Sequence, residues 1–406
     1  MQSHLLPPLT RASRHPGIRA LASCHLITCL IGASLVSTAA AAAADIIFER
    51  VSPPNQTAEI GYFGTSPESP DGSRILYVTY DKPPIPGSKG SPPGALHVCD
   101  SDLRHHVKIR DLKRVYWHDS AHQIWLDNDT LAYMDSEPGK GNRTYVVRKN
   151  GDLVAGPFDA YLGHGDAPNG SVLLVVDKEH YRNGSNLGSY GIYRYQAGTV
   201  TKAVDLERDL GPLQSLFKNP KPPAEWSIGH AQLSTQGTHI SMRLDPKKGL
   251  ECIVTCKADG SDARLFTSKV KPLHQQWYDD STLFGHERGS PFPADGGPTL
   301  RAKRWDRDGR FIEILAGPGN HMGISPDRKY LVSENIYKSD PVVMKLFRTG
   351  RVEPLAVLMT EPAQQVWSMS THVNPAFSRD GKKVYFNKPV DGMPQVYRAD
   401  LSRVID

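Results

Sequence analysis

Runs of alternating apolar and polar residues recur along the chain, and each run follows a short turn-forming segment. The stretches SPDGSRILYVTYD at 69–81 and SRDGKKVYFNKP at 378–389 show the pattern most clearly. Alternation with a period of two residues is typical of β-strands, and Gly beside Asp or Asn is typical of the tight turns that join them. Further copies lie at 167–178, 234–245 and 325–336, and degenerate copies lie at 127–135 and 279–287. The chain therefore repeats one β-rich unit seven times.

The spacing of the copies predicts the fold class. Residues 45–406 divide into seven units of roughly 52 residues, which suits a four-stranded blade with its loops. We therefore expect an all-β fold, a seven-bladed β-propeller, in which the Asp-Gly turns join the first two strands of each blade. The composition contains 35 Gly and 32 Pro, which favours many short strands over long helices. Without a break in composition, we expect 45–406 to form a single propeller domain.

Residues 1–44 have the layout of a secretory signal peptide. Arg11, Arg14 and Arg19 precede an apolar run from about Leu26, and an alanine tract ends at Ala44. Positive charge, then an apolar run, then small residues is the order found in cleaved export signals. We expect an exported protein, periplasmic or secreted, that is not embedded in a membrane.

The charge balance does not indicate a particular class of partner. Without residues 1–44 the chain carries 45 basic and 43 acidic residues. A net charge of about +2, with no basic run interleaved with aromatic residues, does not make the basic surface that nucleic-acid binding needs. We expect no nucleic-acid partner, and the oligomeric state stays open.

Histidine recurs at one position of the repeat, six residues before the turn aspartate or its equivalent. Histidines at or near this position are His122, His164, His230, His274 and His321, while Asn374 takes it in the last copy and His372 lies two residues earlier. Residues two apart share one face of a strand. The first strand of each propeller blade lines the central channel, so we expect the imidazoles to form a ring at its mouth.

A ring of imidazoles supports two kinds of chemistry. Neutral imidazole binds transition metals, and an imidazole near its ordinary pKa of about 6.5 serves as general acid or base. Both suit a site for acidic sugars, where a base removes the proton next to a uronate carboxylate and a cation or strong donors hold the enolate-like intermediate. A histidine here can equally be a structural link between neighbouring blades, so both interpretations stay open.

Several segments resemble the oligogalacturonate lyases, which are seven-bladed propellers of bacterial pectin breakdown. The matching segments are HQQW at 274–277, KADGSDARLF at 257–266, NHMGISPD at 320–327 and THVNPAFSRDGKKVYFN at 371–387. The similarity covers roughly 226–406, and the turn motif by itself is shared with TolB-like propellers. The resemblance implies β-elimination by a histidine base, with a manganese ion, held by three histidines and a glutamine, at the uronate carboxylate.

The resemblance also implies roles for individual residues. His274 falls where the family has its base, and His321 and His372 fall on two metal ligands. The third histidine ligand of the family is Asn374 in this chain, and the glutamine position is Met369, with Gln365 nearby as a candidate ligand.

The catalytic arginine of the family falls near Cys252, and Arg243 on the preceding strand is a possible substitute. His122, His164, His230, Trp277 and Asn374 complete the expected site as contacts to an acidic oligosaccharide.

Two alternatives accompany this interpretation. Ulvan lyases are also seven-bladed propellers that eliminate across uronates with histidine, tyrosine and arginine, and a likeness to them implies another uronate polymer. The residues Asn374 and Met369 at ligand positions favour instead a non-catalytic TolB-like propeller that binds a glycan or a protein.

Overall fold

The computed structural model describes residues 46–82, 92–116, 118–137, 141–247, 250–266, 271–288, 301–335, 340–369 and 371–406. They all belong to one compact unit, Thr38–Asp406. The expected signal peptide at 1–44 lies outside the described residues and stays a prediction. None of the helices in the described ranges has the length and apolar character needed to cross a bilayer.

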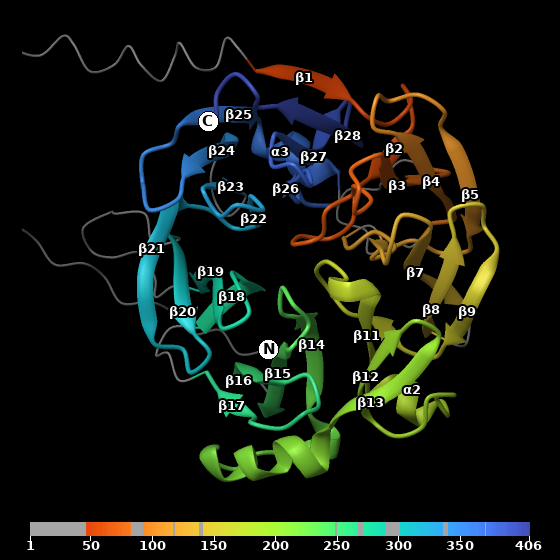
Figure 1. The fold of residues 1–406 in the computed structure, drawn as a ribbon, viewed down its shortest axis with the longest axis vertical. Helices are drawn as coiled ribbons and strands as arrows, with labels where there is room; N and C mark the ends of the chain where they lie inside the picture. Colours follow the sequence, from red (N-terminus) through yellow and green to blue (C-terminus); the bar gives the residue numbers. More distant parts are fainter. Residues whose placement is uncertain are drawn as a thin grey trace, which may run out of the picture. The chain divides into compact units, whose positions relative to one another are not determined.

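Seven four-stranded antiparallel sheets are arranged as blades around a common axis, which confirms the predicted all-β, seven-bladed β-propeller (Figure 1). Blade 1 contains β2 (Thr57–Glu59), β3 (Arg74–Tyr80), β4 (Gly94–Asp100) and β5 (Val107–Leu112). Blade 2 contains β6 (Ile124–Trp125), β7 (Thr130–Glu137), β8 (Gly141–Arg148) and β9 (Leu153–Phe158). Blade 3 contains β10 (Tyr161–Leu162), β11 (Ser171–Val176), β12 (Gly191–Gln196) and β13 (Thr199–Asp205). Blade 4 contains β14 (Ser227–Leu233), β15 (His239–Lys247), β16 (Leu250–Lys257) and β17 (Arg264–Leu265).

The remaining blades follow the same order. Blade 5 contains β18 (Lys271–Trp277), β19 (Thr282–Arg288), β20 (Arg301–Asp306) and β21 (Phe311–Pro318). Blade 6 contains β22 (Met322–Ile324), β23 (Tyr330–Glu334), β24 (Val342–Arg348) and β25 (Ala356–Glu361). Blade 7 contains β26 (Ala376–Phe377), β27 (Lys383–Val390), β28 (Met393–Asp400) and β1 (Ile47–Arg50). Short helical segments lie between strands, namely η2 (Pro168–Gly170), α2 (Lys178–Arg182), η3 (Leu206–Leu210), η4 (Gly211–Leu216), η5 (Pro223–Glu225) and α3 (Ala363–Ser368).

Blade 7 closes the ring because its outermost strand comes from the other end of the chain. In Figure 1 the red β1 lies beside the dark blue β28. The two strands are antiparallel, with Ile47 opposite Asp400 and Arg50 opposite Tyr397. The Arg398 guanidinium also bonds the Glu49 carboxylate at 2.8 Å. Sequence-distant segments therefore share one sheet, and the circle of blades is complete.

The hydrophobic core is divided among the interfaces between blades. The described residues form seven clusters of buried apolar side chains, and each cluster joins two adjacent blades. On β3, Leu76 and Val78 pack against blade 2, whereas Ile75 and Tyr77 pack against blade 7. Both faces of such a strand are buried, so removing apolar area from water drives the blades together around the axis.

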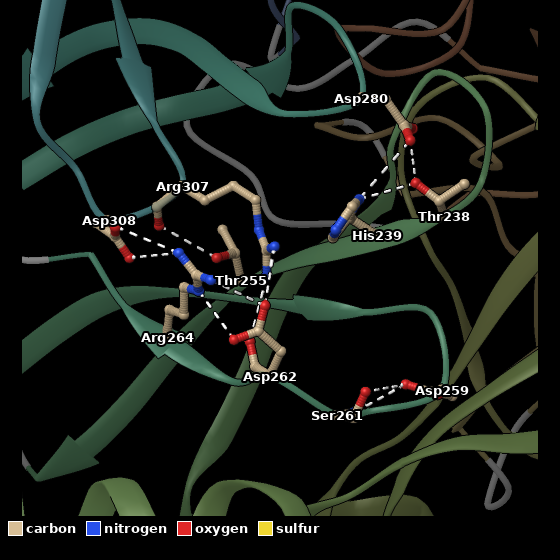
Figure 2. Close-up of polar contacts among 10 residues, drawn as sticks. All are labelled: Thr238, His239, Thr255, Asp259, Ser261, Asp262, Arg264, Asp280, Arg307 and Asp308. Carbon is tan, nitrogen blue, oxygen red and sulfur yellow. Dashed lines mark hydrogen bonds and ion pairs between the residues drawn. The ribbon is translucent and has the colours of Figure 1, made fainter.

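Polar contacts join neighbouring blades at their edges. Figure 2 shows the junction of blades 4 and 5, where the Arg307 guanidinium donates to Asp262 at 3.2 Å and Arg264 donates to Asp308 at 3.3 Å. In the same view Asp280 of blade 5 faces Thr238 and His239 of blade 4. These pairs are partly exposed, so each adds little stability compared with the apolar interfaces.

A buried carboxylate links blade 1 to blade 7. Glu68 is 3% exposed. It accepts the Tyr385 hydroxyl at 2.6 Å and the Arg379 backbone N–H at 2.7 Å. Both donors belong to blade 7, so this residue ties the first repeat to the last.

We predict that Glu68→Ala lowers the free energy of unfolding by about 2 to 4 kcal/mol, because it leaves two buried donors without an acceptor. Chemical denaturation of the two proteins measures the difference. Asp262→Ala, at the partly exposed junction of Figure 2, is the matched control and should cost less than about 1 kcal/mol. Equal losses in the two variants would contradict the role given to Glu68.

Candidate functional site

Two aromatic side chains from blade 1 fill the middle of the channel. They belong to the loop 61–64, in which Phe63 is fully buried and Tyr62 is 6% exposed. The Tyr62 ring lies 5.1 to 6.2 Å from five imidazoles, those of His118, His122, His164, His230 and His321. The Phe63 ring lies 4.9 to 6.1 Å from four, those of His164, His230, His274 and His321. We call residues 62–63 the aromatic plug.

Seven imidazoles surround the aromatic plug. Successive ring centroids are 4.3, 4.2, 4.3, 6.0, 5.0 and 4.7 Å apart in the order His118, His372, His321, His274, His230, His164 and His122. Asp119 completes the circle, since its carboxylate lies 3.6 Å from His118 Nε2 and 3.7 Å from His122 Nε2. The structure thus brings together the histidines that share one offset in the repeat.

A left-handed backbone conformation recurs at this offset in four of the blades. His122, His230 and His274 have φ of 48°, 48° and 51°, and Asn374 has 46°. The pairing registers of β14 and β18 shift at these points. A left-handed residue interrupts an otherwise extended first strand and changes the direction of its side chain. Such uncommon backbone conformations are concentrated at functional sites.

Burial keeps five histidines of the ring uncharged at neutral pH. It lowers the pKa of His230 to about 3, and Arg243 nearby acts in the same direction. Burial and the neighbouring imidazoles hold the pKa values of four more, His164, His274, His321 and His372, well below the ordinary 6.5. Each is therefore a neutral imidazole, which can accept a proton or bind a metal.

A cavity of about 510 Å³ opens on one side of the aromatic plug. We call it the histidine pocket, and its lining includes Tyr62, Asp119, His122, His164, His230, Arg243 and His274. Arg243 lies on β15 opposite Gly229, where a Cβ would come within 3.3 Å of the Arg243 guanidinium. Among the described residues this guanidinium has no ion pair, and Nδ1 of both His164 and His230 lacks a hydrogen-bond partner. The pocket lining thus combines one guanidinium with imidazole rings and with the carboxyl groups of Asp119, Asp177 and Glu251.

One histidine of this pocket also links two blades. His122 Nδ1 donates to the Leu162 carbonyl of blade 3 at 3.3 Å. His274 is held differently, because its Nδ1 lies 3.2 Å from Nε2 of the buried His286 on the adjacent strand. Hydrogen bonds on Nδ1 fix the orientation of both rings and leave Nε2 as the other reactive atom.

A second group of residues has the chemistry of a metal site. His321, Glu334 and His372 offer ligand atoms that all lie within 4.8 Å of one another. His321 Nδ1 donates to Glu334 Oε1 at 2.6 Å, whereas His321 Nε2 and His372 Nδ1 are buried and have no partner among the described residues. A carboxylate behind one nitrogen of an imidazole is the arrangement that orients metal-binding histidines. The residues present therefore fit a divalent metal, with the His118 ring next to His372.

Two residues expected at the site, Trp277 and Gln365, lie apart from these groups. Trp277 donates its indole N–H to the Gln232 carbonyl at 3.3 Å and lines a cavity beyond the aromatic plug. Gln365 is exposed on α3, and its carbonyl accepts the Ser368 hydroxyl at 2.6 Å. Asn374 keeps its place in the repeat with a buried Oδ1 that lacks a partner, while Met369 is fully buried in the core between blades 6 and 7.

Four residues of the site were not expected from the sequence: Tyr62, His118, Asp119 and Glu334. His118, Asp119 and His122 are close in sequence, which is a signal that pattern analysis could have used. Glu334 is opposite Met344 on β24 and reaches His321 only through the fold of blade 6. Tyr62 lies before the repeated turn in a segment without a counterpart in other copies.

Comparisons with known proteins agree with this architecture. No family model and no curated protein sequence matches the chain. The structure is similar to an oligogalacturonate lyase from Vibrio parahaemolyticus, with 14% identity, a TM-score of 0.58, and coverage of 89% of this chain and 99% of that one. It is also similar to an oligogalacturonate lyase in complex with manganese, with 16% identity, a TM-score of 0.57, and coverage of 88% and 94%. At these identities the likeness shows the fold, which is that of a seven-bladed β-propeller.

We predict that the buried histidines make the protein less stable in mild acid. The unfolded chain binds protons on these residues below a pKa of about 6.5, whereas folded His230 does so only near about 3, so the free energy of unfolding falls as pH drops between these values. Each such histidine contributes a slope of about 1.4 kcal/mol per pH unit. Denaturation of metal-free protein from pH 7 to 4 should show a shallower slope for His230→Gln and for His164→Gln. Slopes equal to the wild type would show that these imidazoles are already charged in the folded protein.

Proposed function

We propose that this protein is an exported polysaccharide lyase that cleaves uronate-containing oligosaccharides by β-elimination in the histidine pocket. One observation carries the proposal. The neutral imidazole of His274 and the guanidinium of Arg243, which has no ion pair among the described residues, line one cavity, and a group that fits a metal adjoins it. Base, carboxylate partner and cation are the three components that this elimination requires.

His274 is proposed as the base. Its Nδ1 is engaged by His286, so Nε2 is the atom that would remove the proton from the carbon next to the uronate carboxylate. The electrons of the C–H bond form a double bond, and the glycosidic C–O bond on the neighbouring carbon breaks. The glycosidic oxygen leaves with that bonding pair and takes a proton from water, so one product ends in a hydroxyl and the other in an unsaturated sugar. Burial and the neighbouring imidazoles hold the pKa of His274 well below its ordinary value, so its imidazole is unprotonated before the substrate binds. A bound carboxylate raises the pKa of a nearby imidazole, which strengthens it as a base.

Arg243 is proposed to hold the uronate carboxylate. Its planar fork matches a carboxylate with two parallel hydrogen bonds. Gly229 leaves the space beside the guanidinium that such a ligand needs. The side chains of Arg243, His164 and His230 line one pocket, so they can contact one sugar unit together.

A divalent metal is proposed at His321 and His372, with Glu334 orienting His321. When bound, such an ion neutralises the charge that develops on the carboxylate as the neighbouring proton leaves. The His321 ring lies 4.3 Å from that of His274, so the proposed base and the proposed metal site lie on adjacent blades. Manganese is the metal of the similar oligogalacturonate lyase structure.

We predict that purified protein with manganese generates the ultraviolet absorbance of unsaturated uronates from at least one substrate in a panel of uronate polymers and oligomers. His274→Ala should lower kcat/KM by about 10² to 10⁴, because it removes the base. Arg243→Lys should mainly raise KM by about tenfold, since an ammonium cannot make the two parallel bonds.

His239→Ala is the matched control, because His239 lies at the junction of blades 4 and 5 shown in Figure 2, outside the pocket lining. Its activity should equal that of the wild type. A flat trace across the whole panel would instead favour a propeller that binds a glycan or a protein without catalysis.

We predict that manganese raises the melting temperature of metal-free protein by about 3 °C at a hundredfold excess over its Kd. His372→Ala should abolish the shift, and Glu334→Gln should weaken binding by about 10- to 100-fold. Thermal denaturation measures the shift in melting temperature, and calorimetric titration measures the binding. Gln365→Ala tests the ligand expected from the sequence, and its binding should be unchanged. Loss of binding in Gln365→Ala alone would contradict the site described above.

A further inference from the structure

A second cavity lies beyond the aromatic plug, on the side of the repeated Asp-Gly turns. Its volume is about 430 Å³, and we call it the turn-face pocket. Tyr62 lines the histidine pocket, whereas Gly64 and Thr65 line the turn-face pocket, so the aromatic plug separates the two. Trp125, Trp277 and Phe377 give this second cavity aromatic walls. Nothing in the proposed elimination uses it.

The turn-face pocket has an excess of positive charge. Its charged lining residues are Asp166, Arg328 and Arg379. Asp166 is already engaged, because it binds the Arg379 guanidinium at 2.7 and 3.2 Å and accepts the Ser66 backbone N–H at 3.0 Å. The lining thus has one carboxylate for two guanidinium groups, and because Asp166 binds Arg379, Arg328 is left with no ion pair among the described residues.

The partial burial of the Arg328 guanidinium lowers the stability of the folded protein. Burial lowers the pKa of its guanidinium. The only hydrogen bond described for its side chain is a long one, 3.4 Å, to the Ser325 carbonyl, and the group stands 5.7 Å over the Tyr278 ring. Withdrawing a cation from water without a direct ion pair is unfavourable, and the carboxylates of Asp279, Asp166 and Asp327 only partly offset the effect of burial on this guanidinium. A ligand carboxylate would supply the missing partner.

The backbone at Arg328 is also that of a glycine position. Its N–H bonds the Ser325 carbonyl at 2.9 Å, and the same turn bond is made by Gly72, Gly237 and Gly381 at 2.8, 2.8 and 3.0 Å. Those glycines have φ of 71°, 75° and 74°, and Arg328 has 64°. A residue with a Cβ is disfavoured in this left-handed region, where glycine is not. Blade 6 therefore accepts strain that three other blades avoid, and an observed outlier of this kind points to function.

We propose that the turn-face pocket is a carboxylate-binding site in which Arg328 holds the anion and Trp277 and Phe377 pack against the apolar part of the ligand. The guanidinium fork of Arg328 takes both carboxylate oxygens. This site is separate from the histidine pocket and does not depend on the proposed lyase activity. The carboxylate can belong to a sugar acid or to an amino-acid derivative, and two probes distinguish these sources.

Calorimetric titration of the full protein with D-galacturonate and with N-acetylphenylalanine tests the proposal. We expect one of the two to bind with a Kd of about 1 mM or tighter. Because Arg243 is proposed to hold a uronate in the other pocket, the titration is made in Arg243→Ala protein, where adding Arg328→Gly should weaken the remaining binding at least about tenfold. Arg328→Gly should also melt at the same or a higher temperature than the wild type, because it restores the glycine of the other turns.

Two results would overturn the site. The first is the absence of binding by either probe in the wild type, and the second is binding that survives when Arg328→Gly is combined with Arg243→Ala. A lower melting temperature of Arg328→Gly combined with no wild-type binding would assign Arg328 to stacking on Tyr278. Arg328→Asn, which tolerates a positive φ, gives a second variant that removes the charge. Lyase activity is measured in a separate assay, so a protein without lyase activity would still give a valid result in this binding test.

Discussion

The withdrawal of a circle of imidazoles from water is the constraint on which the rest of this structure depends. Seven blades converge on a channel that Tyr62 and Phe63 fill, so most of the histidines around them are packed against aromatic rings, while the His118 side chain stays 41% exposed. The neutral state of His164, His230, His274, His321 and His372 follows from this burial, as the pKa of about 3 for His230 illustrates. Neutral imidazole is both a proton acceptor and a metal ligand, and the same packing therefore prepares both proposed functions of the ring.

The way in which the blades pack explains how function can be placed in the channel without weakening the fold. Apolar burial lies between blades, as at Leu76 and Ile75 on opposite faces of β3, so the innermost residues are free to be polar. The first strands break at left-handed residues such as His230 and His274. These breaks interrupt little of the sheet and turn side chains toward the axis. Local strain is carried where the chemistry lies, while the blade interfaces hold the ring together.

The repeat made the fold and most of the ring predictable, because strand alternation and a fixed offset are local properties of a sequence. The contact of Glu334 with His321 was not predictable, since it forms between strands of blade 6 and has no spacing rule of its own. Trp277 shares a strand with His274, yet it lies beyond the aromatic plug, because the break at His274 divides the strand between two cavities. Gln365 was proposed as a ligand because it is close in sequence to Met369. It lies exposed on α3, and the repeat pattern does not predict that short helix.

The most direct test of this account is a nitrogen NMR spectrum of protein labelled at histidine, recorded without metal from pH 7.5 to pH 5. Ring nitrogens of neutral and charged imidazole have distinct shifts, so each residue reports its own protonation. The account predicts that His164, His230, His274, His321 and His372 stay neutral over this whole range. Protonation of these rings near pH 6.5, as in a solvated histidine, would show that the channel is wet and would contradict the central claim.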